Sequence, residues 1–363
     1  MSIVAMRAAE SGLLWTFRVL CMRSSRFSLA FAVLALVAAG MPPHKAAITT
    51  ASVVAANLRG VDSHGIQLVP FYVDQLLAGE MDPHTDGRVI SESGACLLYD
   101  GQNGIGQWIA ETCCGHAVRI AGKQGMALVV ARESNHFGAA AWWAQKMRAA
   151  GQIGIVICNA SPIVPPWQGK QGRVGTNPIC MSVPGPWLLD MATTTVAAGR
   201  VFKAFLNGQP EIPAGWAFNS EGVPTTDTAA AYKGMLMPLG GYKGSGLAMM
   251  VEILCAVLGG GAMATEVGGI RFRGKTVRAS QAYIAIEVAR FMPVEEFTAR
   301  VEKLVNLMKT TPAAPGYDEV LVAGDPEWRT EAERRQHGIP LAEGNWEGLC
   351  KAAARVKVAA PAV

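Results

Sequence analysis

The stretch MALVVARESNHFGAAAWWAQKMRAAGQIGIVIC, residues 126–158, indicates the class of fold. Its apolar run 126–131 predicts a buried strand, residues 139–149 predict a helix, and residues 153–158 predict a second buried strand. The residues 134–138 connect the first strand to the helix. A strand, a helix and a strand in this order are typical of an α/β fold.

Further elements are expected on both sides of this unit. On the amino-terminal side, the sequence predicts helices over 45–58, after Pro70 and over 109–121, and a strand near 95–99. On the carboxyl side, it predicts strands over 179–183 and 187–192, a helix from the glycine-rich stretch 238–246 to Leu258, and surface structure over 304–311 and 325–335.

Composition excludes two classes of protein. The chain has 363 residues, of which 50% are hydrophobic and 17% charged, so it can bury a core and is not disordered. Its net charge is only +4, and residues 1–26 alone hold four arginines against one glutamate. The rest of the chain is close to neutral. Because nucleic-acid binding needs clustered lysine and arginine, no nucleic-acid partner is expected.

The apolar residues 27–39 admit two interpretations. They resemble the hydrophobic region of a signal peptide, and they are too short for a membrane span. They also fit a buried first helix that is capped by Gly40 and stopped by the two prolines that follow Met41. We favour the helix and a cytoplasmic location, because no polar spacer follows the apolar run. Export remains the alternative.

The cysteines support a reducing compartment. The eight cysteines include no C-x-x-C pair, and most lie in apolar runs, so they are expected to be buried thiols. Cys113, Cys114 and His116 could be considered as metal ligands, but adjacent cysteines rarely give tetrahedral geometry. No metal site is predicted.

Polar residues follow several of the predicted strands. His136 follows the first strand, residues 159–161 follow the second, and Asp190 lies near the end of another. Ligands in open α/β sheets bind outside the carboxyl ends of strands, so these residues are candidates for a site. The alternative for His136 is a loop histidine bonded to the backbone.

The turn Asp62-Ser63-His64 is the second candidate for chemistry. A carboxylate can fix the tautomer of an imidazole, so a pair of His64 and Asp190 would form an acid/base unit. In the alternative interpretation, Asp62 or Ser63 caps the next segment and His64 only satisfies the backbone. A hydrolase with Ser63 as nucleophile is disfavoured, because no G-x-S-x-G sequence is present.

The glycine-rich stretch 238–246 precedes an apolar helix and contains Lys243. Glycines, a helix N-terminus and a lysine could together hold a phosphate, although such stretches are often only turns. The chain has neither a P-loop nor a G-x-G-x-x-G after a strand, so ordinary Rossmann binding is not supported.

Five segments, taken in order, resemble one known family. They are residues 58–65 (LRGVDSHG), 134–138 (SNHFG), 175–178 (GTNP), 189–193 (LDMAT) and 239–244 (LGGYKG). Together they resemble the type 2 malate/L-lactate dehydrogenase family, which includes ureidoglycolate and sulfolactate dehydrogenases and Δ1-piperideine-2-carboxylate reductase. The resemblance runs from about Leu34 to Leu341.

The resemblance implies NAD or NADP as cofactor, hydride transfer on a 2-hydroxy or 2-oxo acid, no membrane attachment and a homodimer. It also implies a non-Rossmann α/β fold with a mixed sheet and flanking helices, like that of sulfolactate dehydrogenase. The residues that match the family's catalytic set are Ser63, His64, Asp190 and His136. Those that match its cofactor-binding segments are His136, Phe137, Gly138, Ala139, Ala140, Ser161, Asp190, Met191, Ala192 and Lys243. Thr176, Asn177 and His64 are the implied substrate-binding residues.

The resemblance also implies a division of the chain. Residues 1–25 form an extension without a family counterpart, 26–122 a helical segment that carries the turn with His64, and 123–304 the cofactor-binding α/β domain. Residues 305–363 are expected to pack on the helical segment.

One position departs from the family. Many members carry an arginine four residues after the turn histidine, where it can hold the substrate carboxylate, and this chain has Leu68 there. Either another cation substitutes or the substrate differs. The alternatives are therefore a reductase of a cyclic 2-imino acid and a non-catalytic cofactor-binding protein.

Overall fold

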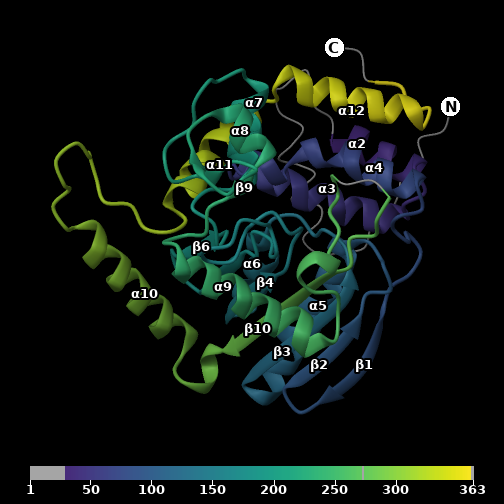
Figure 1. The fold of residues 1–363 in the computed structure, drawn as a ribbon. Coiled ribbons are helices and arrows are strands. Elements are labelled where there is room, and N and C mark those ends of the chain that lie inside the picture. Colours follow the sequence, from purple (N-terminus) through teal and green to yellow (C-terminus); the bar gives the residue numbers. More distant parts are fainter. Residues whose placement is uncertain (1–28, 272–273, 361–363) are drawn as a thin grey trace.

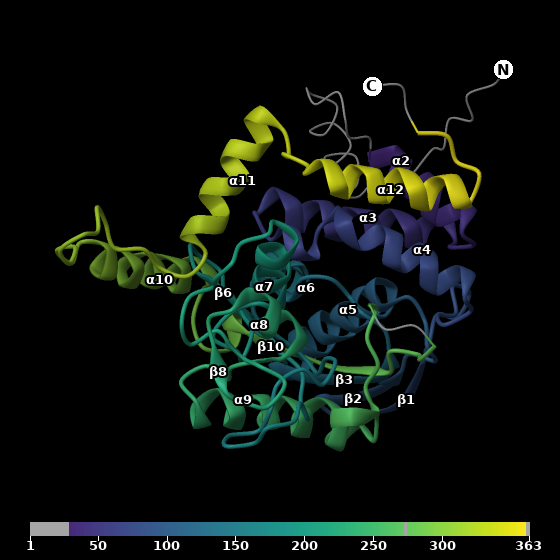
Figure 2. The same ribbon diagram turned by 45° about the horizontal axis from the view of Figure 1, so that its top comes forward.

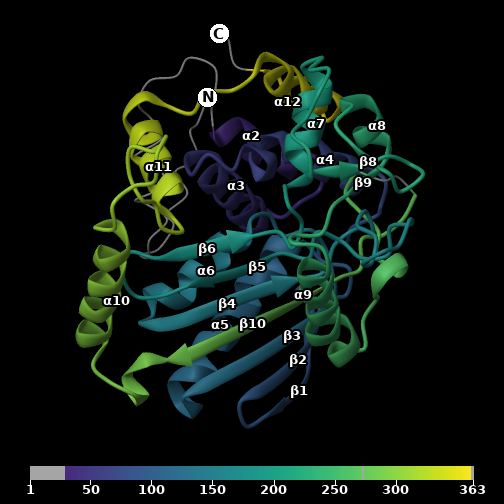
Figure 3. The same ribbon diagram turned by 60° about the vertical axis from the view of Figure 1, so that its left-hand side comes forward.

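The computed structural model describes residues 29–271 and 274–360. The predicted extension 1–25 lies outside these residues. The centre of the protein is a seven-stranded sheet with the order β1-β2-β3-β10-β4-β5-β6 (Figure 3). Its strands are β1 (Arg88–Ser93), β2 (Cys96–Asp100), β3 (Met126–Ser134), β10 (Ala279–Glu287), β4 (Gln152–Cys158), β5 (Ile179–Ser182) and β6 (Leu188–Met191).

The sheet is mixed, as predicted. β2 and β3 are parallel, and all other neighbours are antiparallel. It follows that β2, β3, β4 and β6 point the same way, so their carboxyl ends share one edge. His136 comes just after β3 at this edge, Asn159 follows β4, and Asp190 lies in the last residues of β6. The strands expected over 126–131, 153–158, 179–183 and 187–192 are confirmed, whereas β1 and the central β10 were not predicted.

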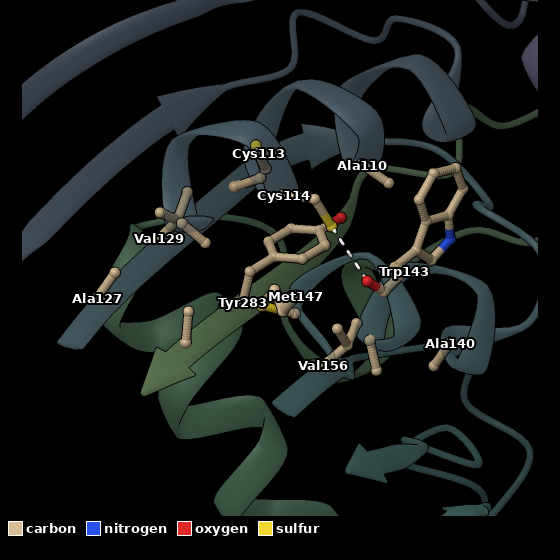
Figure 4. Packing of buried hydrophobic residues seen from close by; sticks show 14 of the residues in the cluster. Ala110, Cys113, Cys114, Ala127, Val129, Ala140, Trp143, Met147, Val156 and Tyr283 are labelled. Atoms are coloured by element: carbon tan, nitrogen blue, oxygen red, sulfur yellow. Dashed lines mark hydrogen bonds between the residues drawn. The ribbon is translucent and has the colours of Figure 1, made fainter. Parts of the chain in front are cut away.

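Both faces of the sheet are covered. α5 (Gly106–Gln124) and α6 (Ala140–Ala149), both predicted, pack on one face. Their hydrophobic cluster includes Trp143 and Tyr283 and buries Cys113 and Cys114 (Figure 4). The Sγ of Cys114 donates to the Trp143 carbonyl over 3.7 Å. α9 (Tyr242–Glu252) and the π-helical η3 (Ile253–Val257) cover the other face. The two cysteines are therefore core residues.

A helical layer lies beside the sheet (Figures 1 and 2). It contains α2 (Leu29–Ala38), α3 (Pro43–Leu58), α4 (Val69–Leu77) and α12 (Glu343–Arg355). The helix expected within 27–39 is confirmed for the described residues, because Phe31 and Leu36 are buried against α4 and α12 and the chain turns at Gly40 with φ +104°. None of the described helices is long and apolar enough to cross a membrane.

The carboxyl-terminal helices return to this layer. α12, which was not predicted, packs on α2 and α4, and α11 (Asp325–His337) packs on α3. α10 (Val294–Lys309) instead runs along the outside of the body (Figures 1 and 3). Of the residues 305–363, those in α11 and α12 thus pack on the first helices, and 305–309 belong to α10; the division of the chain into domains stays a prediction.

A small unit sits over the carboxyl edge of the sheet. It consists of β7 (Ala217–Phe218), β8 (Pro224–Thr225), β9 (Met235–Leu236), α7 (Ala198–Leu206) and α8 (Thr228–Lys233), none of which was predicted. α7 touches the turn that carries His64: a Cβ added at Gly199 would lie 2.6 Å from Ser63 Cβ. The unit therefore closes one side of the candidate site.

Candidate active site

The turn with Ser63 and His64 is a short 3-10 helix, η1 (Asp62–His64), held by Asn57 at the end of α3. The Asn57 amide donates to Asp62 Oδ1 over 2.6 Å and accepts from the backbone N–H of Ile66 over 2.7 Å. A Cβ at Gly65 would collide with this amide, so the position requires glycine. No side chain caps η1 or η2 (Ile66–Leu68), which excludes the capping interpretation of Asp62 and Ser63.

The turn brings His64 against His136. The two rings are stacked, with centroids 5.7 Å apart and planes 19° from parallel. Ser63 Oγ lies 2.9 Å from His64 Nδ1. The structure therefore brings together three of the four predicted catalytic residues at the carboxyl edge of the sheet.

His136 has its tautomer fixed by three further groups. The backbone N–H of Gly138 donates to His136 Nδ1 over 3.3 Å, so this nitrogen carries a lone pair. Tyr72 Oη lies 2.8 Å from the same nitrogen and accepts from Gln107 Nε2 over 2.8 Å, which leaves its own hydrogen for His136. His136 Nδ1 thus accepts, and the ring proton sits on Nε2.

Both histidines are neutral at neutral pH. Burial, assisted by the positive charge of Arg271, lowers the pKa of His64 to about 4. Burial also lowers the pKa of His136 to about 3, with smaller contributions from His64 and Arg271. A neutral His136 with its proton on Nε2 can only donate a hydrogen bond from that atom.

Asp190 does not form the predicted pair with His64. Its Oδ2 accepts the backbone N–H of Ala141, at the start of α6, over 2.9 Å, and no hydrogen bond in the described residues joins it to His64. The reason is that β6 is the edge strand next to α6, whose first N–H groups attract the carboxylate. Burial raises the pKa of Asp190 to about 6, while the Ala141 N–H and Arg59 oppose the rise.

Arg59 is a further candidate that the sequence analysis did not select. Its side chain is buried, and neither Nε nor one terminal nitrogen, Nη1, has a hydrogen-bond partner within the described structure. It lines a small cavity together with Ala141 and Trp142, whose indole N–H is also buried without a partner. An arginine directly after the apolar helix 45–58 was the available signal.

The glycine-rich stretch adjoins Asp190 through backbone contacts. Leu239 N–H donates to the Thr193 carbonyl over 3.0 Å, just beyond the end of β6. Gly240 and Gly241 have φ of +56° and +66°, a conformation that favours glycine. Lys243, in the first turn of α9, is exposed and has no ion pair in the described part of the chain.

The other predicted site residues differ in whether their side chains are free to contact a ligand. Phe137 packs its ring in the core, so only its backbone can meet a ligand. Ser161 Oγ donates to the Gly268 carbonyl over 2.9 Å. Asn177 is fully buried, and its amide hydrogens go to Ala248 O and Glu252 Oε1, each over 3.0 Å. The Asn177 side chain is therefore committed to the fold, whereas Thr176 next to it is half-buried; that these two residues bind substrate stays a prediction.

Comparison with known proteins decides the family. The family model described as malate/L-lactate dehydrogenase matches residues 28–350. The chain belongs to this family. Its members are dehydrogenases, and this member is an oxidoreductase that uses a nicotinamide cofactor and acts on 2-hydroxy acids.

Several relatives and solved structures are similar over most of the chain. Malate dehydrogenase of Pyrococcus horikoshii is 35% identical over 339 residues, which is 90% of this chain and 93% of that protein. L-sulfolactate dehydrogenase of Methanocaldococcus jannaschii is 36% identical over 299 residues, covering 82% and 86%. A solved structure of the Pyrococcus horikoshii OT3 malate dehydrogenase has a TM-score of 0.85 at 33% identity, covering 92% of this chain and 94% of the other.

The family's nicotinamide cofactor fits the residues present. A dinucleotide carries anionic phosphates, and Arg59 supplies buried nitrogens without partners while Lys243 supplies a free ammonium next to two left-handed glycines. Both groups border the segment with Asp190. Among the described residues, no cluster of three or more histidine, cysteine or acidic side chains could hold a metal.

Proposed function

We propose that the protein transfers a hydride between a nicotinamide cofactor, NAD or NADP, and a 2-hydroxy or 2-oxo acid, with His64 and His136 in different roles. The stacked pair of neutral imidazoles carries this proposal. His136 Nε2–H donates to the substrate oxygen and polarises the C–O bond. His64 moves the proton.

The proton path begins at the substrate oxygen. With Nδ1–H of His64 donating to Ser63 Oγ, Nε2 has a lone pair that accepts the hydroxyl proton during oxidation. The bound nicotinamide supplies the hydride acceptor, or the donor in reduction. In reduction, protonated His64 returns its proton to the oxygen as the C–O double bond becomes a single bond.

The cofactor is proposed to lie along the carboxyl edge of the sheet. His136, Phe137, Gly138, Ala139, Ala140, Ser161, Asp190, Met191, Ala192 and Lys243 are its proposed contacts. Asp190 has one carboxylate oxygen held by Ala141, so the other can accept from a ribose hydroxyl. We add Arg59 for the phosphates, because its buried nitrogens have no other partner.

A homodimer is supported by an exposed apolar face. Met249, Ile253, Val257 and Leu258, on the helix formed by α9 and η3, are each more than half exposed. Three of these residues are spaced four apart on the helix that covers the sheet, and exposed apolar side chains that cluster in this way are typical of an interface. Measuring the mass in solution by light scattering tests it: a monomer at all concentrations contradicts the dimer. Buried free thiols support a cytoplasmic location.

A reductase of a cyclic 2-imino acid is the second candidate. A solved structure of Δ1-piperideine-2-carboxylate reductase from Pseudomonas syringae has a TM-score of 0.78 at 28% identity, covering 89% of this chain and 97% of the other. Such a substrate places a C=N group, in place of C=O, at the histidine pair. The non-catalytic alternative is disfavoured because Ser63, His64 and His136 are all present and correctly juxtaposed.

One experiment tests both candidates. The purified protein is mixed with NADH or NADPH and a panel that includes oxaloacetate, pyruvate, sulfopyruvate and Δ1-piperideine-2-carboxylate, and the loss of nicotinamide absorbance is followed. Turnover of a 2-oxo acid supports the main proposal, and exclusive turnover of the imine supports the second. Absence of turnover together with absence of cofactor binding contradicts both.

A further inference from the structure

We propose that Arg271 binds the substrate carboxylate next to the reacting carbon, and so replaces the arginine that this chain lacks at position 68. This assignment rests on the proposed function of the histidine pair. It identifies the residue that selects for acids over their neutral analogues.

Position 68 cannot supply the cation. Leu68 is an aliphatic residue, its side chain is 2% exposed, and it belongs to the core formed by α2, α4 and α12. A 2-hydroxy acid nevertheless carries its carboxylate on the carbon that bears the reacting oxygen. A cation or a set of aligned N–H groups is therefore needed within a few ångströms of the histidines.

Arg271 lies between two elements that hold the histidine pair. Its guanidinium carbon is 5.2 Å from the ring centroid of Phe71 and 4.9 Å from that of Phe202. Phe71 directly precedes Tyr72, whose hydroxyl bonds to His136. Phe202 lies one turn after Gly199 on α7, and Gly199 packs on Ser63.

The electrostatics agree with this position. Arg271 lowers the pKa values of both His64 and His136, so its charge acts on both rings. Because both histidines are neutral at neutral pH, the charge of Arg271 is not cancelled or reinforced by the rings, and it attracts an anion to this site. The site is therefore complementary to a carboxylate.

The guanidinium is prepared for a ligand. Arg271 is exposed, and no ion pair or hydrogen bond joins its side chain to another described residue. Desolvation lowers its pKa. The guanidinium carbon lies over two aromatic rings, and a guanidinium can bind a planar acceptor through two parallel N–H bonds. A carboxylate has this geometry.

The segment that carries Arg271 is anchored on both sides. The neighbouring Ile270 is buried in the helical core. Gly268 N–H donates to the Val277 carbonyl over 2.8 Å, and the Gly268 carbonyl accepts from Ser161 Oγ. On the far side, the Gly274 N–H donates to Glu80 Oε1 over 2.7 Å.

The test compares Arg271→Met and Arg271→Lys with the control Lys275→Met, which changes an exposed lysine on the same segment. Steady-state kinetics are measured with pyruvate, oxaloacetate and the methyl ester of pyruvate, and the affinities for NADH and oxamate by calorimetry. Arg271→Met should lower kcat/KM for both acids about 100-fold, as expected for a lost charge-assisted hydrogen-bond pair, and weaken oxamate binding similarly. NADH affinity should change less than about twofold.

Two further results are expected. The preference for pyruvate over its methyl ester should disappear in Arg271→Met, because the ester lacks the charge. In Arg271→Lys, kcat/KM for the acids should fall about 10-fold, since lysine keeps the charge but not the bidentate geometry. Lys275→Met should behave as the wild type.

The outcomes separate this assignment from the proposed function. Suppose that the wild type turns over 2-oxo acids. If kcat/KM of Arg271→Met then stays within threefold of the wild-type value, or falls only with the dicarboxylate oxaloacetate, the assignment of Arg271 is wrong and the proposed dehydrogenase function is unaffected. If the wild type neither turns over a 2-oxo acid nor binds NADH or NADPH, the proposed function fails, and the assignment fails with it. Thermal unfolding of each variant checks that it is folded.

Discussion

The imidazole rings of His64 and His136, which come from the turn after α3 and the loop after β3, lie stacked with their centroids 5.7 Å apart. The environments of the rings differ. His136 has Nδ1 occupied by two donors, whereas the hydrogen-bond partner of the His64 ring within the described residues is the Ser63 hydroxyl, which can donate or accept. This asymmetry supports the proposed roles, in which His136 donates the hydrogen bond and His64 carries the mobile proton.

Replacing Tyr72 by phenylalanine removes one donor from His136 Nδ1 while keeping the ring. The neutral tautomers of His136 then become closer in energy, and kcat should fall about 10-fold with KM for the cofactor unchanged. Nitrogen NMR of labelled histidine should show Nε2 protonated in the wild type and a mixture in Tyr72→Phe. The same tautomer in both proteins, with the same kcat, would show that Tyr72 only fills space.

The pH dependence of oxidation follows from the lowered pKa of His64. Oxidation needs neutral His64, whose pKa in the free enzyme is about 4. Protonation therefore inactivates the enzyme only at low pH, and kcat/KM for a 2-hydroxy acid should rise with pH around 4 and reach a plateau below pH 6. If kcat/KM were half-maximal at a pH near the ordinary histidine pKa of about 6.5, burial would not shift the pKa of the essential group.

Arg59→Met should weaken cofactor binding. The substitution removes the buried cation that is proposed to face the phosphates, so the Kd for NADH should rise about 10-fold to 100-fold, as measured by nicotinamide fluorescence. Arg59→Lys should recover part of the affinity. Unchanged affinity in Arg59→Met would place the phosphates elsewhere, with Lys243 as the next residue to replace.

Gly65→Ala tests the rigidity of the catalytic turn. The added Cβ would collide with the Asn57 amide, which also holds Asp62 and Ile66. We expect a loss of about 2–4 kcal/mol in the free energy of unfolding and a clear fall in kcat. Gly94→Ala, with φ +55° but nothing within 4 Å of the added atom, is the control for a substitution at an exposed turn, and its kcat should be unchanged. Wild-type kcat in Gly65→Ala would show that the turn tolerates displacement.

The sequence predicted the elements with continuous apolar runs and missed the central strand. The second and third residues of β10, Ser280 and Gln281, are polar and nevertheless fully buried. Both residues are bonded to distant segments: the backbone N–H of Ser280 donates to Asn159 Oδ1 over 2.8 Å, and Gln281 Nε2 donates to the Asn135 carbonyl over 3.0 Å, whereas Ser280 Oγ has no partner among the described residues. A hydropathy pattern cannot show such partners, because they come from distant parts of the chain.

The same limit applies to the site. His64 and His136 could be selected from their positions in a turn and at a strand end. Tyr72, Gln107 and Arg271 could not, because their importance depends on contacts with those histidines and with two phenylalanines that only the folded chain creates. The predicted pair of His64 and Asp190 failed for the same reason: the N-terminus of α6 holds the carboxylate instead.

The central claim is that His64 carries the proton, and the single-turnover rate of His64→Gln with bound cofactor tests it most directly. Loss of the general acid/base should lower the rate of hydride transfer by about 10²-fold to 10⁴-fold, while the Kd for the cofactor stays within about twofold. In His136→Gln the amide can still donate a hydrogen bond, so the rate of hydride transfer should fall less than in His64→Gln. A His64→Gln rate within threefold of the wild type would contradict the account.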